Sequence, residues 1–87
     1  MSNTTPRRAL VTGGSGDLGL AIARRLARDG LHVIVHANTR RDAAEAVAAQ
    51  IRADGGSAEA VAFDVTDAEA SRAALETLLQ AGPVQVI

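Results

Sequence analysis

The stretch Leu10–Gly30, LVTGGSGDLGLAIARRLARDG, decides the fold of this chain. A short apolar run leads into a loop with four glycines, and a helical pattern follows directly. This arrangement is typical of phosphate binding, because a helix N-terminus presents free N–H groups and a partial positive charge to an anion. A tight turn without any ligand is the structural alternative. The position after a strand and before a helix favours phosphate binding.

Three glycine spacings fit this loop. G-x-G-x-x-G, starting at position 14, is the general dinucleotide fingerprint. T-G-x-x-G-x-x-G and T-G-x-x-x-D-x-G both start at position 12. We favour a mixed interpretation in which Gly13, Gly16 and Gly19 are the glycines that approach the phosphates. Asp17 then caps the first helix, with its carboxylate directed away from the ligand.

Periodicity along the rest of the chain alternates between strands and helices. Apolar, β-branched runs predict strands at 8–12, 32–37, 58–63 and 84–87. Apolar residues at helical spacing predict helices within 17–30, 40–56 and 64–83, the last with Asp67 as its N-cap. The expected inward faces are Leu18, Ala21, Ile22, Leu26 and Ala27 in the first helix, Ala44, Val47 and Ile51 in the second, and Leu75, Leu78 and Leu79 in the third.

The predicted order β-α-β-α-β-α-β indicates an α/β fold, the N-terminal half of a Rossmann-type doubly wound parallel sheet. Short loops and helical crossovers require parallel strands joined by right-handed connections. Residues 1–87 then form one partial dinucleotide-binding domain that stops within its fourth strand. The first two helices should cover one face of the sheet and the third helix the other. One helix cannot cover four strands, and the last strand is an apolar edge, so we expect further chain, or another chain, to pack here.

The composition narrows the possible functions. The net charge is −1 and 22% of the residues are charged, a balance that argues against nucleic acid or an anionic membrane as partner. The chain has no cysteine, which excludes disulfides and thiolate metal sites, and no metal site is predicted. The polar N-terminus lacks a signal-peptide pattern, so a cytoplasmic location is expected. The chain has no tyrosine and all nine basic side chains are arginine, so this chain alone excludes a mechanism that needs a phenol or an amine.

The segment VTGGSGDLG, residues 11–19, resembles the glycine loop of the short-chain dehydrogenase/reductases. Ordinary-length members of that family carry T-G-x-x-x-G-x-G, and longer members carry T-G-x-x-G-x-x-G. The segments ADGGSAEAVAFDVTDAEA (53–70) and GPVQVI (82–87) are similar to the third-strand region and the approach to the fourth strand of the ordinary-length type. The resemblance covers nearly the whole chain and is nearest to the 3-oxoacyl-(acyl carrier protein) reductases. Asp17 departs from it, because the ordinary-length pattern has a glycine there.

The end of the second predicted strand bears on the choice of nucleotide. Dinucleotide folds that bind NAD usually place an acid there, which binds the ribose 2′-hydroxyl. Positions 36–39 are His, Ala, Asn and Thr, and Arg40 and Arg41 follow. Arginine pairs with phosphate through a planar fork, so NADP(H) is favoured over NAD(H). Arg41 is more simply the solvated start of a helix, and the resemblance implies that Asn38 lies near the 2′-phosphate.

Further binding residues come from the other loops. Asp64 ends the third predicted strand, at the edge where open α/β sheets bind ligands, although a turn or cap residue is the alternative. The resemblance implies that its side chain accepts a hydrogen bond from the adenine amino group, with help from the Val65 backbone. His32 and His36 have no partner at ligand or triad spacing and are interpreted as strand residues. The predicted cofactor-binding set is Gly13, Ser15, Gly16, Leu18, Gly19, Asn38, Arg40, Asp64 and Val65.

The resemblance implies hydride transfer between a nicotinamide and a carbonyl or alcohol. In the family a tyrosine acts as acid, a lysine lowers its pKa, and a serine and an asparagine assist. The tyrosine, the lysine and the substrate loop would lie beyond Ile87. No catalytic residue is therefore predicted in this chain, which should be inactive alone. The whole protein is expected to be an NADP-dependent oxidoreductase that acts on a small-molecule or acyl-carrier-bound carbonyl, and a homo-oligomer.

Two other classes of protein stay open. One is a catalytically inactive nucleotide-binding module, or a fragment that pairs with another chain. The other is a methyltransferase with a Rossmann-like sheet, which is less favoured because no acid ends the second predicted strand to hold a ribose.

Overall fold

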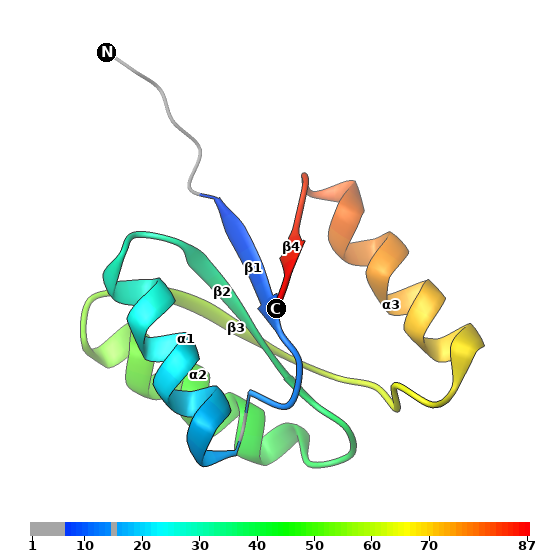
Figure 1. The fold of residues 1–87 in the computed structure, drawn as a ribbon, viewed down its shortest axis with the longest axis horizontal. Helices are drawn as coiled ribbons and strands as arrows, with labels where there is room; N and C mark the ends of the chain where they lie inside the picture. The colour runs from blue at the N-terminus through cyan, green and yellow to red at the C-terminus, as the bar shows by residue number, and fades with distance from the viewer. Residues whose placement is uncertain (1–6, 15) are drawn as a thin grey trace.

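The computed structural model describes residues 7–14 and 16–87, in which strands and helices alternate (Figure 1). The strands are β1 (Arg8–Val11), β2 (His32–Ala37), β3 (Ser57–Ala62) and β4 (Gln85–Val86). The helices are α1 (Asp17–Arg28), α2 (Arg41–Ala53) and α3 (Ala68–Gln80). The predicted order of elements is confirmed. No helix within the described ranges has the length and apolar character that crossing a bilayer requires.

The four strands form one parallel sheet in the order β3-β2-β1-β4. Leu10 of β1 pairs with Ile34 of β2 on one side and with Val86 of β4 on the other. The chain therefore builds outward from β1 to β3 and then returns through α3 to the far side of β1. This reversal creates a topological switch point beside β1, the place where open α/β sheets bind ligands. The α/β class and the Rossmann-type half-sheet are confirmed.

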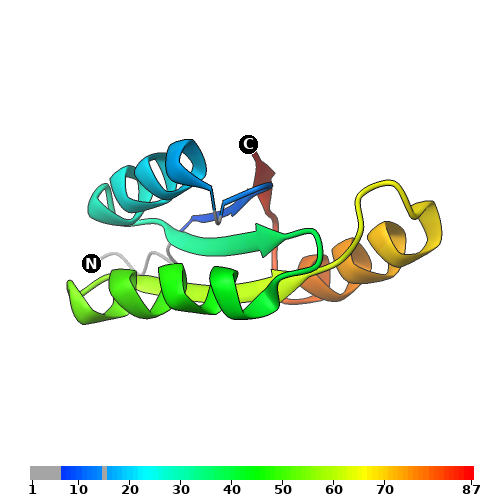
Figure 2. The ribbon, with the colours of Figure 1, turned by 90° about the horizontal axis from the view of Figure 1, so that it is seen from below.

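Alternating strand residues supply two apolar clusters on opposite faces of the sheet. The larger cluster lies between the sheet and the pair α1 and α2. Its buried residues are Val11, Ala23, Val33, Val35, Ala37, Ala44, Val47, Ala48, Ile51, Ala58 and Ala60. The smaller cluster joins Leu10 and Ile34 to Leu78 of α3. Both views show α3 apart from the α1–α2 pair (Figure 1, Figure 2). Because Val33 and Val35 belong to the larger cluster and Ile34 between them to the smaller one, the predicted division of helices between the faces is confirmed.

Three residues of the predicted inward faces are exposed instead. Leu18 is 76% exposed, Leu79 is 54% exposed, and Ala21 is exposed as well. The helix α1 contacts the sheet through Ala23, which is fully buried. Each residue turns a helix by about 100°, so Leu18 and Ala21 lie nearly opposite Ala23. In α3, Leu78 contacts the sheet. The same rotation of about 100° turns Leu79 away from the sheet.

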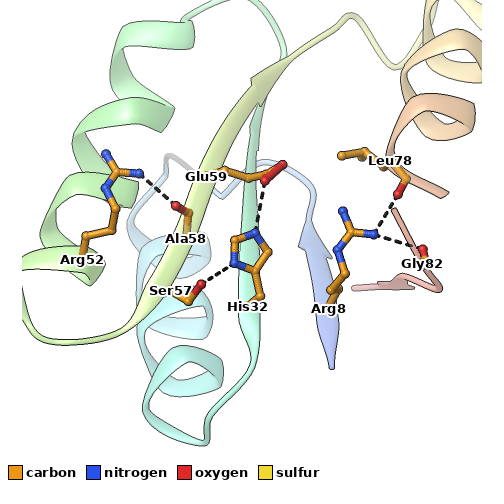
Figure 3. A network of polar contacts seen from close by, with 8 residues as sticks. All are labelled: Arg8, His32, Arg52, Ser57, Ala58, Glu59, Leu78 and Gly82. Carbon is orange, nitrogen blue, oxygen red and sulfur yellow. Dashed lines mark hydrogen bonds and ion pairs between the residues drawn. The ribbon is translucent and has the colours of Figure 1, made fainter. Parts of the chain in front are cut away.

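The amino ends of the strands carry polar contacts on the α3 side of the sheet (Figure 3). Arg8 of β1 donates from Nη1 to the carbonyl oxygens of Leu78 at 2.7 Å and Gly82 at 3.0 Å. A guanidinium is favourable there, because the C-terminal end of a helix carries partial negative charge. His32 of β2 contacts two side chains of β3, so it is not isolated in space. These contacts lie at the opposite end of the strands from the glycine loop.

Candidate nucleotide-binding site at the carboxyl edge of the sheet

Three loops meet at the carboxyl edge of the sheet, because parallel strands all end on the same side. They are the glycine loop between β1 and α1, the segment 38–40 after β2, and the segment 63–67 after β3. Hydrogen bonds join the glycine loop to the end of β2, and join the segment after β2 to the segment after β3. The edge is therefore one connected surface built from residues that the sequence keeps apart.

Three of the four loop glycines are required by the packing of the chain itself. Gly13 has a φ of +66°, a left-handed conformation that residues with a side chain rarely adopt. A Cβ on Gly14 would lie 2.9 Å from the Val11 carbonyl oxygen. A Cβ on Gly19 would lie 2.6 Å from the Gly14 Cα. The loop is thus folded tightly between β1 and α1.

Gly16 is different, because nothing in the described structure requires a glycine there. Its φ of −81° and ψ of 171° are extended backbone that any residue adopts. An added Cβ would meet the Gly13 carbonyl oxygen at an ordinary distance of 3.7 Å. Gly16 is the N-cap of α1, so its missing side chain leaves space at the positive end of that helix. A phosphate group fits the chemistry of this space.

Asp17 does not cap α1, so this part of the sequence-based interpretation is wrong. Gly16 is the N-cap, and its carbonyl oxygen accepts a hydrogen bond from the Leu20 amide at 2.7 Å. Asp17 is the first helical residue and is exposed. The physical reason is that Gly16 already has the extended backbone of an N-cap, one residue earlier. An acid in the first turn still stabilises the helix, because it lies near the positive end of the macrodipole.

His36, near the end of β2, holds the glycine loop from within the protein. The Gly13 amide donates to His36 Nδ1 at 3.1 Å, and the Gly14 amide donates to the His36 carbonyl oxygen at 2.9 Å. On the other side of the ring, Nε2 lies 2.7 Å from the Phe63 carbonyl oxygen. Because Nδ1 accepts and a carbonyl oxygen can only accept, these partners assign a neutral imidazole with its proton on Nε2.

The sequence pattern identifies His36 only as a strand residue and misses this role. Its partners are 23 and 27 residues away along the chain, so no local spacing reveals them. One signal in the sequence could have identified this role. His36 is a polar residue at the carboxyl end of a buried strand, and that strand must lie beside the strand that leads into the glycine loop.

Asn38 joins the segment after β2 to the segment after β3. Its Oδ1 accepts from the Val65 amide at 3.0 Å, and its Nδ2 donates to Asp64 Oδ1 at 3.3 Å. The same Asp64 oxygen accepts from the hydroxyl and the amide of Thr66, at 2.7 and 2.9 Å. Hydrogen bonds, first that of the Thr66 hydroxyl, hold the pKa of the Asp64 carboxyl below its usual value. Asp64 is therefore a turn residue and an ionised acceptor on an exposed edge.

Arg40 is engaged by a carboxylate two residues further along. Its Nε and Nη2 each donate to one oxygen of Asp42, both at 3.1 Å. This fork is the arrangement that a guanidinium also offers to a phosphate. Hydrogen bonding within the pair raises the pKa of the Arg40 guanidinium and lowers the pKa of the Asp42 carboxyl. The sequence places Asp42 in a helix, which is confirmed, but the ion pair is an additional finding.

The other predicted residues of the site have mixed surroundings. Leu18 and Val65 are apolar side chains, 76% and 52% exposed, on the elements of the carboxyl edge. Ser15 lies outside the described residues. Among the described hydrogen bonds, Arg40 has no contact with the glycine loop, so it lies on the same edge without being joined to it.

Comparisons with known proteins agree with this architecture. Residues 7–87 match the short chain dehydrogenase family. An uncharacterized oxidoreductase of Methylorubrum extorquens is 41% identical over 80 residues, which are 92% of this chain and 32% of that protein. A 3-oxoacyl-[acyl-carrier-protein] reductase of Aggregatibacter actinomycetemcomitans is 46% identical over 57 residues, which are 66% of this chain and 24% of that protein.

A solved structure gives the same result in three dimensions. The crystal structure of a metagenomic short-chain oxidoreductase in complex with NADP is 37% identical and superposes with a TM-score of 0.82, over 86% of this chain and 34% of that one. The chain thus spans about a quarter to a third of the length of these relatives. The glycine loop, the parallel half-sheet and the sequence match lead to one conclusion: the chain belongs to the short-chain dehydrogenase/reductase family.

Proposed function

We propose that this chain is the NADP(H)-binding portion of an oxidoreductase that reduces a carbonyl or oxidises an alcohol by hydride transfer. The observation that carries the proposal is the open space at Gly16. The fold does not require a glycine at this position, but a phosphate group would use the space that the missing side chain leaves. Its relatives include oxidoreductases, and one is solved with NADP. When bound, the nicotinamide supplies or accepts the hydride. The residues of this chain bind and orient the rest of the cofactor.

The glycine loop and the start of α1 are proposed to hold the pyrophosphate. Gly13 and Gly19 keep the loop pressed against α1, and Gly16 leaves room for the ligand. The first-turn amides of α1 and the helix macrodipole favour an anion at this position. Ser15 belongs to the proposed set as a hydroxyl for a phosphate or ribose oxygen. Leu18 offers an exposed apolar side chain in the first turn of α1.

The Asp64–Val65 pair is proposed to bind adenine. The Asp64 carboxylate, whose pKa is lowered by its hydrogen bonds, would accept from the adenine amino group. Asn38 now presents an acceptor to the Val65 amide and a donor to Asp64. An acceptor beside an amino group is also the pattern that the N1 and N6 atoms of adenine offer. Adenine would therefore replace Asn38 at these two groups and free its amide for the ribose phosphate.

Preference for NADP(H) over NAD(H) rests on Arg40 and on the lack of an acid at positions 36–39. The 2′-phosphate would replace Asp42 as the partner of the Arg40 fork. The activity, a small-molecule or acyl-carrier-bound carbonyl substrate, homo-oligomeric assembly and a cytoplasmic location are proposed for the whole protein. The 3-oxoacyl reductase relative supports that substrate class. Residues 1–87 contain neither tyrosine nor lysine, so this portion alone is expected to give no turnover.

Nucleotide titration of the protein, as its gene encodes it, tests the proposal. Gly16→Leu should weaken NADPH binding by roughly tenfold or more, because the side chain fills the phosphate space. It should lower the free energy of unfolding by no more than about 1 kcal/mol, since a Cβ has room there. Ala21→Leu, on the exposed side of α1, is the matched control and should bind as the wild type does. Unchanged NADPH affinity in Gly16→Leu, or no binding by the wild type, contradicts the proposal.

A further inference from the structure

We infer that His36 is a positioning residue for the nucleotide, which sets the glycine loop at a fixed place relative to the segment after β3. Its effect on NADP(H) rests on the proposed function, whereas its hydrogen bonds are independent of any ligand. His36 is 2% exposed and is the only buried polar residue among those the structure describes. A polar group in that environment is stable only when its hydrogen bonds are made.

One imidazole ring joins two segments that the proposed function uses separately. Nδ1 accepts from the Gly13 amide at 3.1 Å, on the pyrophosphate side. Nε2 donates to the Phe63 carbonyl oxygen at 2.7 Å, immediately before the Asp64–Val65 pair on the adenine side. The His36 and Phe63 rings also contact, with centroids 4.3 Å apart. A single buried side chain therefore links the two halves of the site directly.

The left-handed turn at Gly13 explains why this contact matters. The turn takes the loop away from the β1 ladder, and His36 supplies an acceptor to the Gly13 amide inside the protein. The neighbouring Gly14 amide bonds the carbonyl oxygen of the same residue at 2.9 Å. Two consecutive amides thus hold the loop before any ligand arrives. A pre-ordered loop binds phosphate more tightly, because the ligand does not have to order it.

Three substitutions separate the two ring contacts. His36→Asn keeps an acceptor near the position of Nδ1, and His36→Gln keeps a donor near the position of Nε2. His36→Leu keeps neither. Two ligands report on the two halves of the site. NADPH contains a pyrophosphate, whereas adenosine 2′-monophosphate has the adenine and the 2′-phosphate without it.

Calorimetric titration of the whole protein should distinguish these variants by the ring contact that each of them loses. His36→Gln and His36→Leu should weaken NADPH about five- to tenfold, the effect of one lost hydrogen bond. In His36→Gln the Kd for adenosine 2′-monophosphate should stay within about twofold, because this variant keeps a donor for the Phe63 carbonyl oxygen on the adenine side. His36→Asn should keep the NADPH Kd within about twofold, since the Gly13 amide retains its acceptor. Equal NADPH affinity in His36→Asn and His36→Gln, or affinities that simply follow thermal stability, overturn the inference.

A measurement without nucleotide separates this inference from the proposed function. In ¹⁵N-labelled protein, a scalar coupling across the hydrogen bond should connect the Gly13 amide nitrogen with His36 Nδ1, and His36→Gln should lack it. Absence of the coupling in the wild type overturns the inference. A coupling in a wild-type protein that does not bind NADPH contradicts the proposed function instead, and leaves the attachment of the loop to His36 intact.

Discussion

Arg40 and Asp42 form a two-point ion pair at the start of α2, with both donor–acceptor distances at 3.1 Å. Both side chains are largely exposed, at 72% and 74%. A pair in water adds little to stability, because solvent and salt screen the attraction. Its importance lies in the fork, since Arg40 cannot offer the same two donors to Asp42 and to a phosphate at once. Asp42 therefore acts as an internal competitor for the proposed 2′-phosphate contact.

Removing the Asp42 charge should strengthen NADPH binding. Asp42→Asn frees the Arg40 fork and should lower the NADPH Kd about two- to fivefold, the range expected for an exposed ion pair. The NADH Kd should not change, because NADH has no 2′-phosphate. The measurement is a titration of both nucleotides at low ionic strength. Asp29→Asn breaks another exposed pair, that with Arg25, and should leave both constants unaltered. An equal gain for NADPH and NADH in Asp42→Asn would refute competition at the phosphate.

The Asp64 carboxyl gives a stability that depends on pH. Its folded pKa lies below the ordinary value of 3.8, so the ionised form is favoured in the folded protein. The contribution of the ionised carboxylate to the free energy of unfolding is fully present above the unfolded pKa. It is lost as the pH falls through the folded pKa. Unfolding free energies of wild type and Asp64→Asn should therefore differ by a constant amount at neutral pH. This difference should begin to shrink below about pH 3.8 and level off only below the folded pKa. Denaturant titrations at several pH values measure this difference.

The Thr66 hydroxyl should be the main cause of that low pKa. Thr66→Val removes the 2.7 Å hydrogen bond to Asp64 Oδ1 and should move the Asp64 pKa upward, toward its ordinary value. Carboxyl chemical shifts followed by NMR across acidic pH report the change. Thr77→Val is the control, because the Thr77 hydroxyl bonds a carbonyl within its own helix. No upward movement in Thr66→Val would show that another group sets the Asp64 pKa.

The glycine loop should tolerate a methyl group at one position and reject it at another. Gly19→Ala places a Cβ 2.6 Å from the Gly14 Cα, and such overpacking should cost about 1–3 kcal/mol of unfolding free energy. Gly16→Ala has ordinary van der Waals distances and should change stability by no more than about 1 kcal/mol. Urea denaturation of the two variants compares them directly. Similar losses at both positions would mean that the loop is not packed against α1 as described.

Arg8 should stabilise the C-terminal end of α3. Arg8→Met keeps most of the side-chain volume and removes the guanidinium from the Leu78 and Gly82 carbonyl oxygens. The expected loss is about 1–3 kcal/mol of unfolding free energy, because two carbonyls lose a charged donor. The neighbouring Arg7 is exposed, and Arg7→Met should change stability by less than about 0.5 kcal/mol. Equal effects of the two substitutions would assign the loss to net charge instead.

Features that depend on local periodicity were predictable from the sequence. The β-α alternation and the buried stripe Ala44, Val47 and Ile51 follow from apolar spacing, and the structure confirms them. Asp67 is confirmed as the N-cap of α3, where its side chain accepts from the Ala70 amide at 3.0 Å. These features need only neighbours within one or two helical turns, so the sequence contains the necessary information.

Two kinds of feature were not predictable from the sequence: the rotation of a helix about its own axis, and contacts between residues far apart along the chain. Leu18 fits a helical stripe by spacing, yet the orientation of α1 is set by the close fit of Ala23 and Gly19 against sheet and loop. The contacts of His36 and Asn38 cross between strands, and no spacing along the chain encodes them. The structure places Gly13, Asn38 and Asp64 at the carboxyl edge, but their hydrogen bonds required the fold. Their role in nucleotide binding stays a prediction.

The order of strands also has a kinetic consequence. The hydrogen bonds that join the three loops of the carboxyl edge span 23 to 27 residues, whereas the link from Thr12 to Ile87 spans 75 residues. Shorter loops close with less loss of chain entropy, and local contacts speed folding. We therefore expect the carboxyl edge to assemble from β1 to β3 before β4 arrives. During synthesis, a nascent chain would already expose this edge while α3 was still inside the ribosome.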